Sequence, residues 1–233
     1  SAWDDMYTMC EMAIEEDDDS MLEELASEYK NFAEKAESMR LGTLLTGEYD
    51  ANNALLTLHP GAGGTEAQDW ASMLYRMYVR YCERRGYTVS PIPVDSKGRL
   101  DMECAREMID ADTAVVSVMW ANNEIGNIYP VAELAELAHS QGALFHTDAV
   151  QAVGKVQMDL KNMPIDMLSL SGHKLHAPKG VGALYVRRGV RFHPFIIGGH
   201  QERGRRAGTE NVASIVALGK AAELAKANFA TEN

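Results

Sequence analysis

Lys174 stands in the stretch that decides the fold, Ser169-Leu170-Ser171-Gly172-His173-Lys174-Leu175-His176-Ala177-Pro178-Lys179-Gly180-Val181-Gly182. A strand-like apolar run, 165–170, leads into it, and a second apolar run, 183–186, follows its Gly-Val-Gly turn. Apolar runs bounded by glycine turns predict strands of a sheet. The lysine is therefore expected at the edge of a rigid sheet, where its amine can meet a carbonyl group at a fixed angle.

Short strands and helices alternate on both sides of this stretch, from Val89 onward. We expect strands at 113–119, 143–147, 167–170 and 183–186, and helices at 131–141 and 211–229. This rhythm predicts an α/β fold with a mainly parallel sheet covered by helices. The first edge of the sheet is expected to be open, with a preceding long helix covering part of it.

The first third of the chain has a different pattern. Helical spacing of apolar residues at 3–16 and 21–39, separated by an acidic break, predicts an α-helical hairpin. A strand at 55–58, a loop at 59–64 and a long helix at 65–85 ended by Gly86 are expected next. We therefore divide the chain into a hairpin at 1–50, a strand-loop-helix segment at 51–88 and an α/β core at 89–233.

Composition narrows the possible functions. The chain has 233 residues and a net charge of −12, and residues 1–89 hold 18 acidic against 7 basic residues. An acidic surface repels phosphate backbones, so direct binding to nucleic acid is not expected. The three cysteines lie far apart with no metal-ligand spacing, which predicts free thiols in a reducing cytoplasm and no metal site. No apolar run is long enough to predict a membrane partner.

Five ordered blocks of the region from Tyr87 to the end resemble cysteine desulfurases, which belong to the class V aminotransferases and have the type I fold of pyridoxal-phosphate enzymes. The blocks are 93–100, 117–126 (Ser-Val-Met-Trp-Ala-Asn-Asn-Glu-Ile-Gly), 146–152 (His-Thr-Asp-Ala-Val-Gln-Ala), 171–182 and 198–211. The resemblance implies a partial type I core and pyridoxal 5'-phosphate as cofactor. It also implies sulfur transfer from an L-cysteine-like amino acid for iron-sulfur cluster assembly, in a homodimer.

The same resemblance gives the site residues their roles. Lys174 would bind the cofactor aldehyde covalently, and Asp148 would pair with the pyridine nitrogen, where a carboxylate keeps the ring protonated and able to accept electrons. Gln151 and Asn123 would contact the ring oxygen. Taken singly, an aspartate after a strand can equally be a helix cap, and a lysine beside glycine can be a surface turn.

Further positions would hold the phosphate of the cofactor. Ser171 and His173 match the family's phosphate binders, and His173 also stands beside the catalytic lysine. Thr209 matches the residue that the partner subunit contributes. Arg203, Arg205 and Arg206 form a basic loop suited to an anion, or alternatively a solvated face.

Other parts of the desulfurase pattern are not found in this sequence. The family's N-terminal phosphate loop and ring-stacking histidine do not occur in their expected context. Its loop with the nucleophilic cysteine and its carboxylate-binding arginine lie further toward the C-terminus than residue 233. None of Cys10, Cys82 and Cys104 stands in the family's cysteine motif. Sulfur transfer needs a thiolate delivered to the substrate, so we expect an incomplete or inactive desulfurase.

Residues 1 to about 88 resemble another family, bacterial peptide chain release factor 2. The resemblance rests on the block 59–78, His-Pro-Gly-Ala-Gly-Gly-Thr-Glu-Ala-Gln-Asp-Trp-Ala-Ser-Met-Leu-Tyr-Arg-Met-Tyr, and on 83–87. The codon-reading tripeptide and the Gly-Gly-Gln loop are not present. Three readings stay open: a desulfurase core with a foreign N-terminus, a module that binds the ribosome or translation proteins, and a chimera without chemistry.

Overall fold

The computed structural model describes residues 2–16, 20, 22–44, 53–54 and 65–232. It separates into two compact units, Ser1–Glu48 and Tyr49–Asn233. The strand predicted at 55–58 and the loop predicted at 59–64 lie outside the described residues. Each unit is described by itself.

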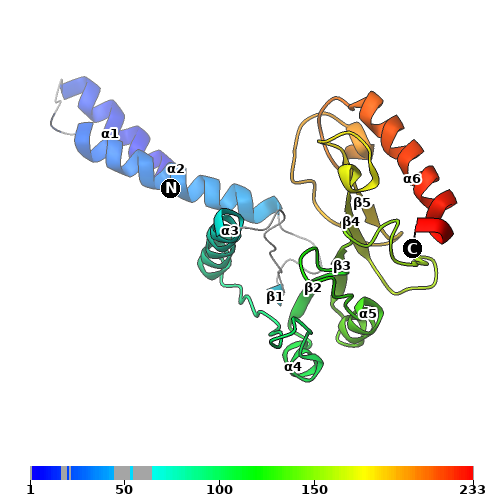
Figure 1. Cartoon of the computed structure of the whole chain (residues 1–233). Coiled ribbons are helices and arrows are strands. Elements are labelled where there is room, and N and C mark those ends of the chain that lie inside the picture. Colours follow the sequence, from blue (N-terminus) through cyan, green and yellow to red (C-terminus); the bar gives the residue numbers. More distant parts are fainter. Residues whose placement is uncertain (1, 17–19, 21, 45–52, 55–64, 233) are drawn as a thin grey trace. The chain divides into compact units, whose positions relative to one another are not determined.

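The first unit is a pair of helices, α1 (Ala2–Glu16) and α2 (Leu22–Leu44). They pack side by side along their length (Figure 1), and the rings of Trp3 and Phe32 stand 5.7 Å apart between them. The predicted helices are confirmed, although α2 continues five residues beyond Met39. Large apolar side chains of the pair nevertheless remain exposed, among them Trp3, Tyr7 and Tyr29.

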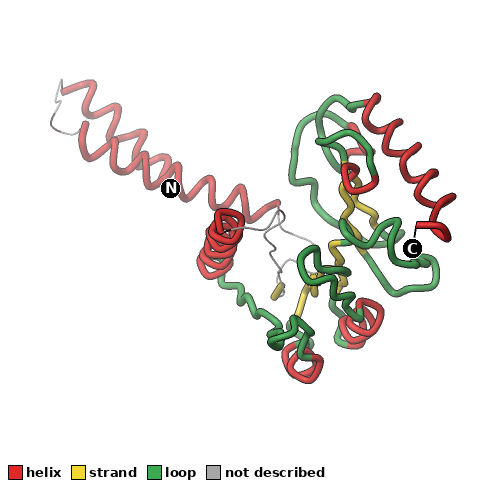
Figure 2. Tube along the Cα trace, viewed as in Figure 1, coloured by secondary structure: helices red, strands yellow, loops and turns green. Residues whose placement is uncertain are grey.

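The second unit contains a five-stranded sheet in the order β1-β2-β3-β4-β5. Its strands are β1 (Asn53–Ala54), β2 (Thr113–Met119), β3 (Leu144–Asp148), β4 (Met167–Ser171) and β5 (Gly182–Val186). The first four run parallel and β5 is antiparallel to β4. The mainly parallel α/β sheet predicted from the sequence is confirmed. Figure 2 draws its strands in yellow.

Helices connect and cover these strands. The second unit holds α3 (Thr65–Arg84), α4 (Met102–Met108), α5 (Val131–Ser140) and α6 (Val212–Glu232). Helix α5 packs on β2 and β3, and its residues Leu134, Ala135 and Ala138 are fully buried. Helix α4 was not predicted, because seven residues are too few to show a periodic pattern. Its N-cap, Asp101, accepts hydrogen bonds from the backbone N–H groups of Glu103 and Cys104.

The two faces of the sheet differ in polarity because side chains alternate along each strand. On one face Val116, Phe145 and Leu168 are buried in the core. On the other face Ser117, His146, Asp148, Ser169 and Ser171 are half-buried. The polar face therefore carries the groups that could do chemistry.

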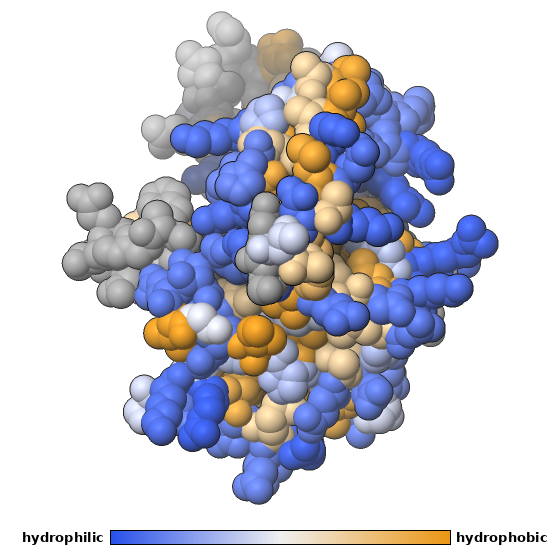
Figure 3. All heavy atoms as spheres, turned by 45° about the vertical axis from the view of Figure 1, so that its right-hand side comes forward, coloured by the Kyte–Doolittle hydropathy of each residue, from blue (hydrophilic) through white to orange (hydrophobic). Residues whose placement is uncertain are grey.

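Helix α6 carries apolar residues that other parts of the second unit leave exposed. Val212, Val216 and Leu224 are exposed on it. Figure 3 turns this side of the molecule forward and shows apolar atoms gathered across the middle of the face. None of the helices that the structure describes is both long and apolar enough to cross a membrane.

Candidate active site

Three neighbouring parallel strands bring candidate residues to one edge of the sheet. Asp148 is the last residue of β3, and its Cα pairs with Met119 of β2 and Ser169 of β4. Asn123 follows the end of β2, and Lys174 follows the end of β4. The carboxyl ends of parallel strands are where α/β sheets bind their ligands. This edge is the candidate site.

The carboxylate of Asp148 is held by the turn that follows its strand. Its Oδ1 accepts a hydrogen bond from the backbone N–H of Val150 at 2.9 Å, and its backbone carbonyl accepts one from Trp120 at 2.8 Å. Residues 150–155 form turns and no α-helix, so this aspartate does not cap an α-helix. The carboxylate is half-buried, so its charge is only partly screened by water.

Lys174 lies in a single 3-10 turn, Gly172–Leu175, directly after β4. The turn is anchored by the backbone N–H of Gly172, which donates to the carbonyl of Val181 at 2.8 Å, and by the buried side chain of Leu175. A Cβ at residue 172 would come within 2.8 Å of the Val181 Cγ1 atom. Glycine is therefore required here, because it alone lets β4 and the following loop approach closely.

The predicted phosphate binders Ser171 and His173 are in contact. The hydroxyl of Ser171 and Nδ1 of His173 lie 2.7 Å apart, with the serine half-buried and the imidazole exposed. The predicted ring-oxygen ligand Gln151 accepts a hydrogen bond from Lys155 Nζ at 3.1 Å. The Ser171–His173 pair and the Gln151–Lys155 pair therefore bring hydrogen-bonding side chains close to the ends of β4 and β3.

Other predicted residues lie in loops. Asn123 is half-buried in a turn. The neighbouring Asn122 closes this turn, because Asn122 Oδ1 accepts hydrogen bonds from the backbone N–H groups of Glu124 and Ile125. Thr209 is exposed in the segment before α6. In the basic loop, the Arg205 guanidinium stands 6.0 Å from the ring centroid of Phe192.

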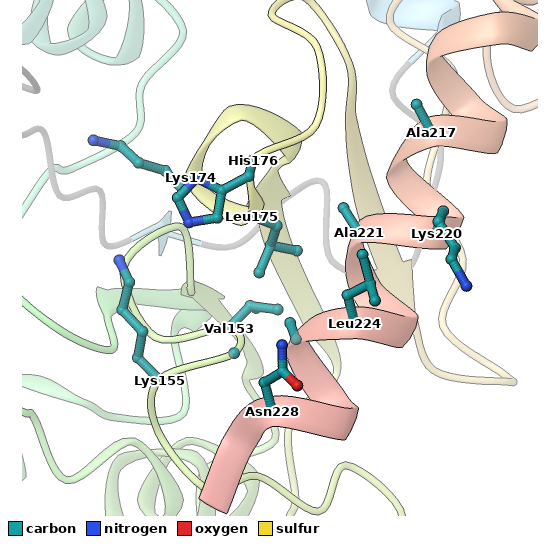
Figure 4. A pocket seen from close by; sticks show the side chains of 12 residues that line it. Val153, Lys155, Lys174, Leu175, His176, Ala217, Lys220, Ala221, Leu224 and Asn228 are labelled. Atoms are coloured by element: carbon teal, nitrogen blue, oxygen red, sulfur yellow. The ribbon is translucent and has the colours of Figure 1, made fainter. Parts of the chain in front are cut away.

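An open cavity of about 420 Å³ adjoins the lysine turn. Its walls are the segment 153–155, residues 174–176 and the face of α6 that includes Leu224 and Asn228. Figure 4 shows Lys155 and Lys174 on the side of the cavity away from α6. Lys174 lines this cavity but Asp148 does not, so the cavity is not the centre of the candidate site.

Sequence reasoning missed a histidine between two serines on the polar face. His146 Nδ1 lies 2.8 Å from Ser117 Oγ, and its Nε2 lies 2.8 Å from Ser169 Oγ. Burial lowers the pKa of His146, while the nearby charge of Asp148 raises it to a smaller extent. The signal in the sequence was weak: single polar residues at alternate positions of three apolar strands.

The aminotransferase class-V family matches residues 65–233, and the PCRF domain family matches residues 1–115. The two matches overlap at 65–115. The resemblance of the chain to two different families is therefore confirmed.

The relatives are cysteine desulfurases. A cysteine desulfurase, NifS, of Azotobacter vinelandii is 64% identical over 153 residues, 66% of this chain and 38% of its own length. One from Gluconacetobacter diazotrophicus is 65% identical over 149 residues, 64% of this chain and 37% of its own. The chain thus spans less than two fifths of the length of these curated relatives.

Solved structures give the same fold. A NifS-like protein matches with a TM-score of 0.67 and 36% identity, covering 82% of this chain and 50% of that one. DndA from Streptomyces lividans matches with a TM-score of 0.64 and 38% identity, covering 82% and 52%. The predicted type I core with helices is therefore confirmed.

Proposed function

Since the chain belongs to the aminotransferase class-V family, we propose that its second unit binds pyridoxal 5'-phosphate through Lys174, as a cysteine desulfurase-like core. Enzymes of this family and the cysteine desulfurases depend on that cofactor. The observation that carries the proposal is the convergence of Asn123, Asp148 and Lys174 at the carboxyl ends of β2, β3 and β4.

The chemistry of the donor groups fits this cofactor. The amine for the aldehyde, the carboxylate for the ring nitrogen, and the hydroxyl and imidazole groups for the phosphate lie at or just after the ends of the adjacent strands β3 and β4. Because Asp148 pairs with Ser169, the carboxylate lies beside β4, the strand that leads into the lysine turn. The tight Gly172 turn fixes where Lys174 leaves that strand.

Each residue has a distinct part in the proposal. When bound, the cofactor supplies an electron sink for an amino acid substrate. The Asp148 carboxylate favours a positive charge on the ring nitrogen, and Lys174 Nζ holds or moves the proton at the substrate's α-carbon. Ser171 and His173 hold the phosphate in this proposal.

Asn123 and Gln151 orient the ring through its oxygen in the same proposal. Thr209 would reach a phosphate only in a second copy of the chain, so its part depends on a homodimer. We propose that the unit works in the cytoplasm on an L-cysteine-like amino acid.

Complete sulfur transfer would also require a thiolate at the substrate. Cys104 is on α4, with its Sγ 3.2 Å from Met108 Sδ, and Cys10 and Cys82 are on α1 and α3. None of the three follows a strand end of the candidate site. We therefore propose that this chain binds the cofactor and an amino acid without transferring sulfur from L-cysteine.

Visible absorbance with added pyridoxal phosphate tests the proposal, followed by borohydride reduction and peptide mapping. We expect the visible absorption band that pyridoxal phosphate shows when it is bound to a protein lysine. After borohydride reduction, the label should be found on Lys174. Lys174→Ala should abolish both, whereas Lys179→Ala, an exposed lysine in the same loop, should change neither. Label spread evenly over surface lysines would refute the proposal and favour a chimera without chemistry.

The PCRF match over residues 1–115 supports a second candidate function. The acidic hairpin α1–α2 would dock on the ribosome or on translation proteins. We expect the intact chain to co-sediment with ribosomes at low salt and a chain without residues 1–48 to stay in the supernatant. Equal behaviour of the two chains would exclude this function.

A further inference from the structure

A chain of hydrogen bonds crosses the three strands that carry the candidate site. The imidazole of His146 links Ser117 of β2 to Ser169 of β4, with both distances at 2.8 Å. A neutral imidazole has one N–H donor and one acceptor nitrogen, and a hydroxyl can serve as either. One histidine thus bridges both neighbours of its own strand.

The bridge runs toward Asp148. Ser117 is the register partner of His146 on β2, but Ser169 is the register partner of Asp148 on β4. The ring therefore reaches diagonally, from its own row of the sheet into the row of the carboxylate. His146 and Asp148 are two positions apart on β3, so both project from the same face.

Few charged groups lie near this ring on the neighbouring strands that the structure describes. On the same face, β2 offers Ser117 and Met119, and β4 offers Met167 and Ser169. Asp148 is the charged group that acts on the imidazole, and its effect is smaller than that of burial.

We propose that His146 is a positioning residue for Asp148, because its bonds to Ser117 and Ser169 fix the strand of the carboxylate between β2 and β4, the strands that lead to Asn123 and Lys174. The inference rests on the proposed cofactor site and adds a residue that acts through Asp148. A neutral imidazole suits this task, since a cation beside Asp148 would compete with the ring nitrogen for its charge.

Titration of the His146 ring by NMR in the cofactor-free chain is the first test. Asp148→Asn removes a group that raises the pKa of His146, so this variant should lower that pKa further. Ser169→Ala frees one end of the ring. In that background, Asp148→Asn should change the pKa less, because a ring held at one end can move away from the carboxylate. An equal change in both backgrounds would overturn the proposal, because the bond to Ser169 would then not hold the ring near Asp148.

Cofactor binding is the second test, with variants that keep one bond each. The amide nitrogen of His146→Gln can reach Ser169, that of His146→Asn can reach Ser117, and His146→Leu keeps neither. Since each lost bond weakens the arrangement modestly, we expect the dissociation constant to rise about tenfold in His146→Leu and less in His146→Gln. Thr147→Val, on the opposite face of β3, is the matched control and should leave it unchanged.

The two tests separate this inference from the proposed function. Wild-type chain that fails to label Lys174 refutes the cofactor site, while the titration still decides whether His146 and Asp148 are coupled through Ser169. Equal dissociation constants for wild type and His146→Leu overturn the positioning role. If His146→Leu does not fold, the single-hydroxyl variant Ser169→Ala replaces it: a dissociation constant raised severalfold supports the role, and an unchanged one overturns it.

Discussion

Arg187 should be one of the most destabilising residues to replace in the second unit. Its guanidinium donates hydrogen bonds to the carbonyl oxygens of Ile165 and Leu160, each at 2.9 Å, and to that of Met163. These three carbonyls belong to the loop that leads into β4, so the arginine closes this loop over the start of the strand. Substitution by methionine keeps much of the aliphatic bulk but leaves all three acceptors without this donor.

The expected cost follows from the number of bonds. At about 1 kcal/mol for each hydrogen bond, Arg187→Met should lower the free energy of unfolding by roughly 3 kcal/mol. For a unit of this size, that corresponds to a fall in Tm of about 6–12 °C. Thermal unfolding followed by tryptophan fluorescence measures it, because Trp120 is buried in the same core. Arg187→Lys should recover only part of the loss, since one ammonium cannot reach three carbonyls in the same geometry.

Arg188 provides the matched control, because it is the neighbouring arginine and is exposed. Arg188→Met should leave the Tm within about 1 °C of wild type, as surface substitutions usually do. Equal Tm values for Arg187→Met and Arg188→Met would refute the argument that the loop bonds stabilise the unit. Because β4 precedes the Lys174 turn, Arg187→Met should also reduce borohydride labelling of Lys174.

Three further predictions concern the core, the lysine turn and pH. The Thr147 hydroxyl is buried with no hydrogen-bond partner among the described residues, so Thr147→Val should raise stability by about 1 kcal/mol in urea unfolding. Gly172→Ala should destabilise by about 1–3 kcal/mol because its Cβ would clash with Val181, whereas Gly219→Ala on α6, with open space around it, should stabilise by about 0.5–1 kcal/mol. The pKa of His146 is lower in the folded state than in the unfolded state, so the unfolded chain binds the proton first. The contribution of the neutral His146 to the free energy of unfolding should therefore be fully present above about pH 6.5 and be lost as the pH falls below that value. The variant His146→Gln should lack this pH dependence of the Tm.

The elements of the sheet that carry the site could be predicted from sequence because their signals are local. The bounds of β2 could be predicted because 113–119, Thr-Ala-Val-Val-Ser-Val-Met, is mostly apolar and rich in β-branched residues. The Lys174 turn follows β4 as the glycine pattern indicates. The helix predicted at 65–85 is also confirmed, and it ends before Gly86, whose φ is +77°.

The pairing of segments that lie far apart along the chain could not be predicted from the sequence. The pairing of β1 with β2 joins residues about 60 positions apart, and two residues are too few to show a strand pattern. The hydrogen bonds of His146 likewise depend on the register of three strands, which no local pattern encodes. The antiparallel direction of β5 follows from its short connection to β4, because parallel neighbours need a crossover.

The two compact units do not divide the chain at the point where its resemblance changes from the release factor to the cysteine desulfurases. The segment 49–88 resembles the release factor in sequence, yet it belongs to the second unit and contributes β1 to the edge of its sheet. An unpaired β2 would offer a row of free backbone groups to another chain. We expect removal of residues 1–48 to leave the second unit monodisperse in light scattering at its original Tm, and removal of 1–88 to cause aggregation. If both truncated chains stay equally monodisperse, the two residues of β1 do not protect the edge, and another segment of 89–233 must cover it.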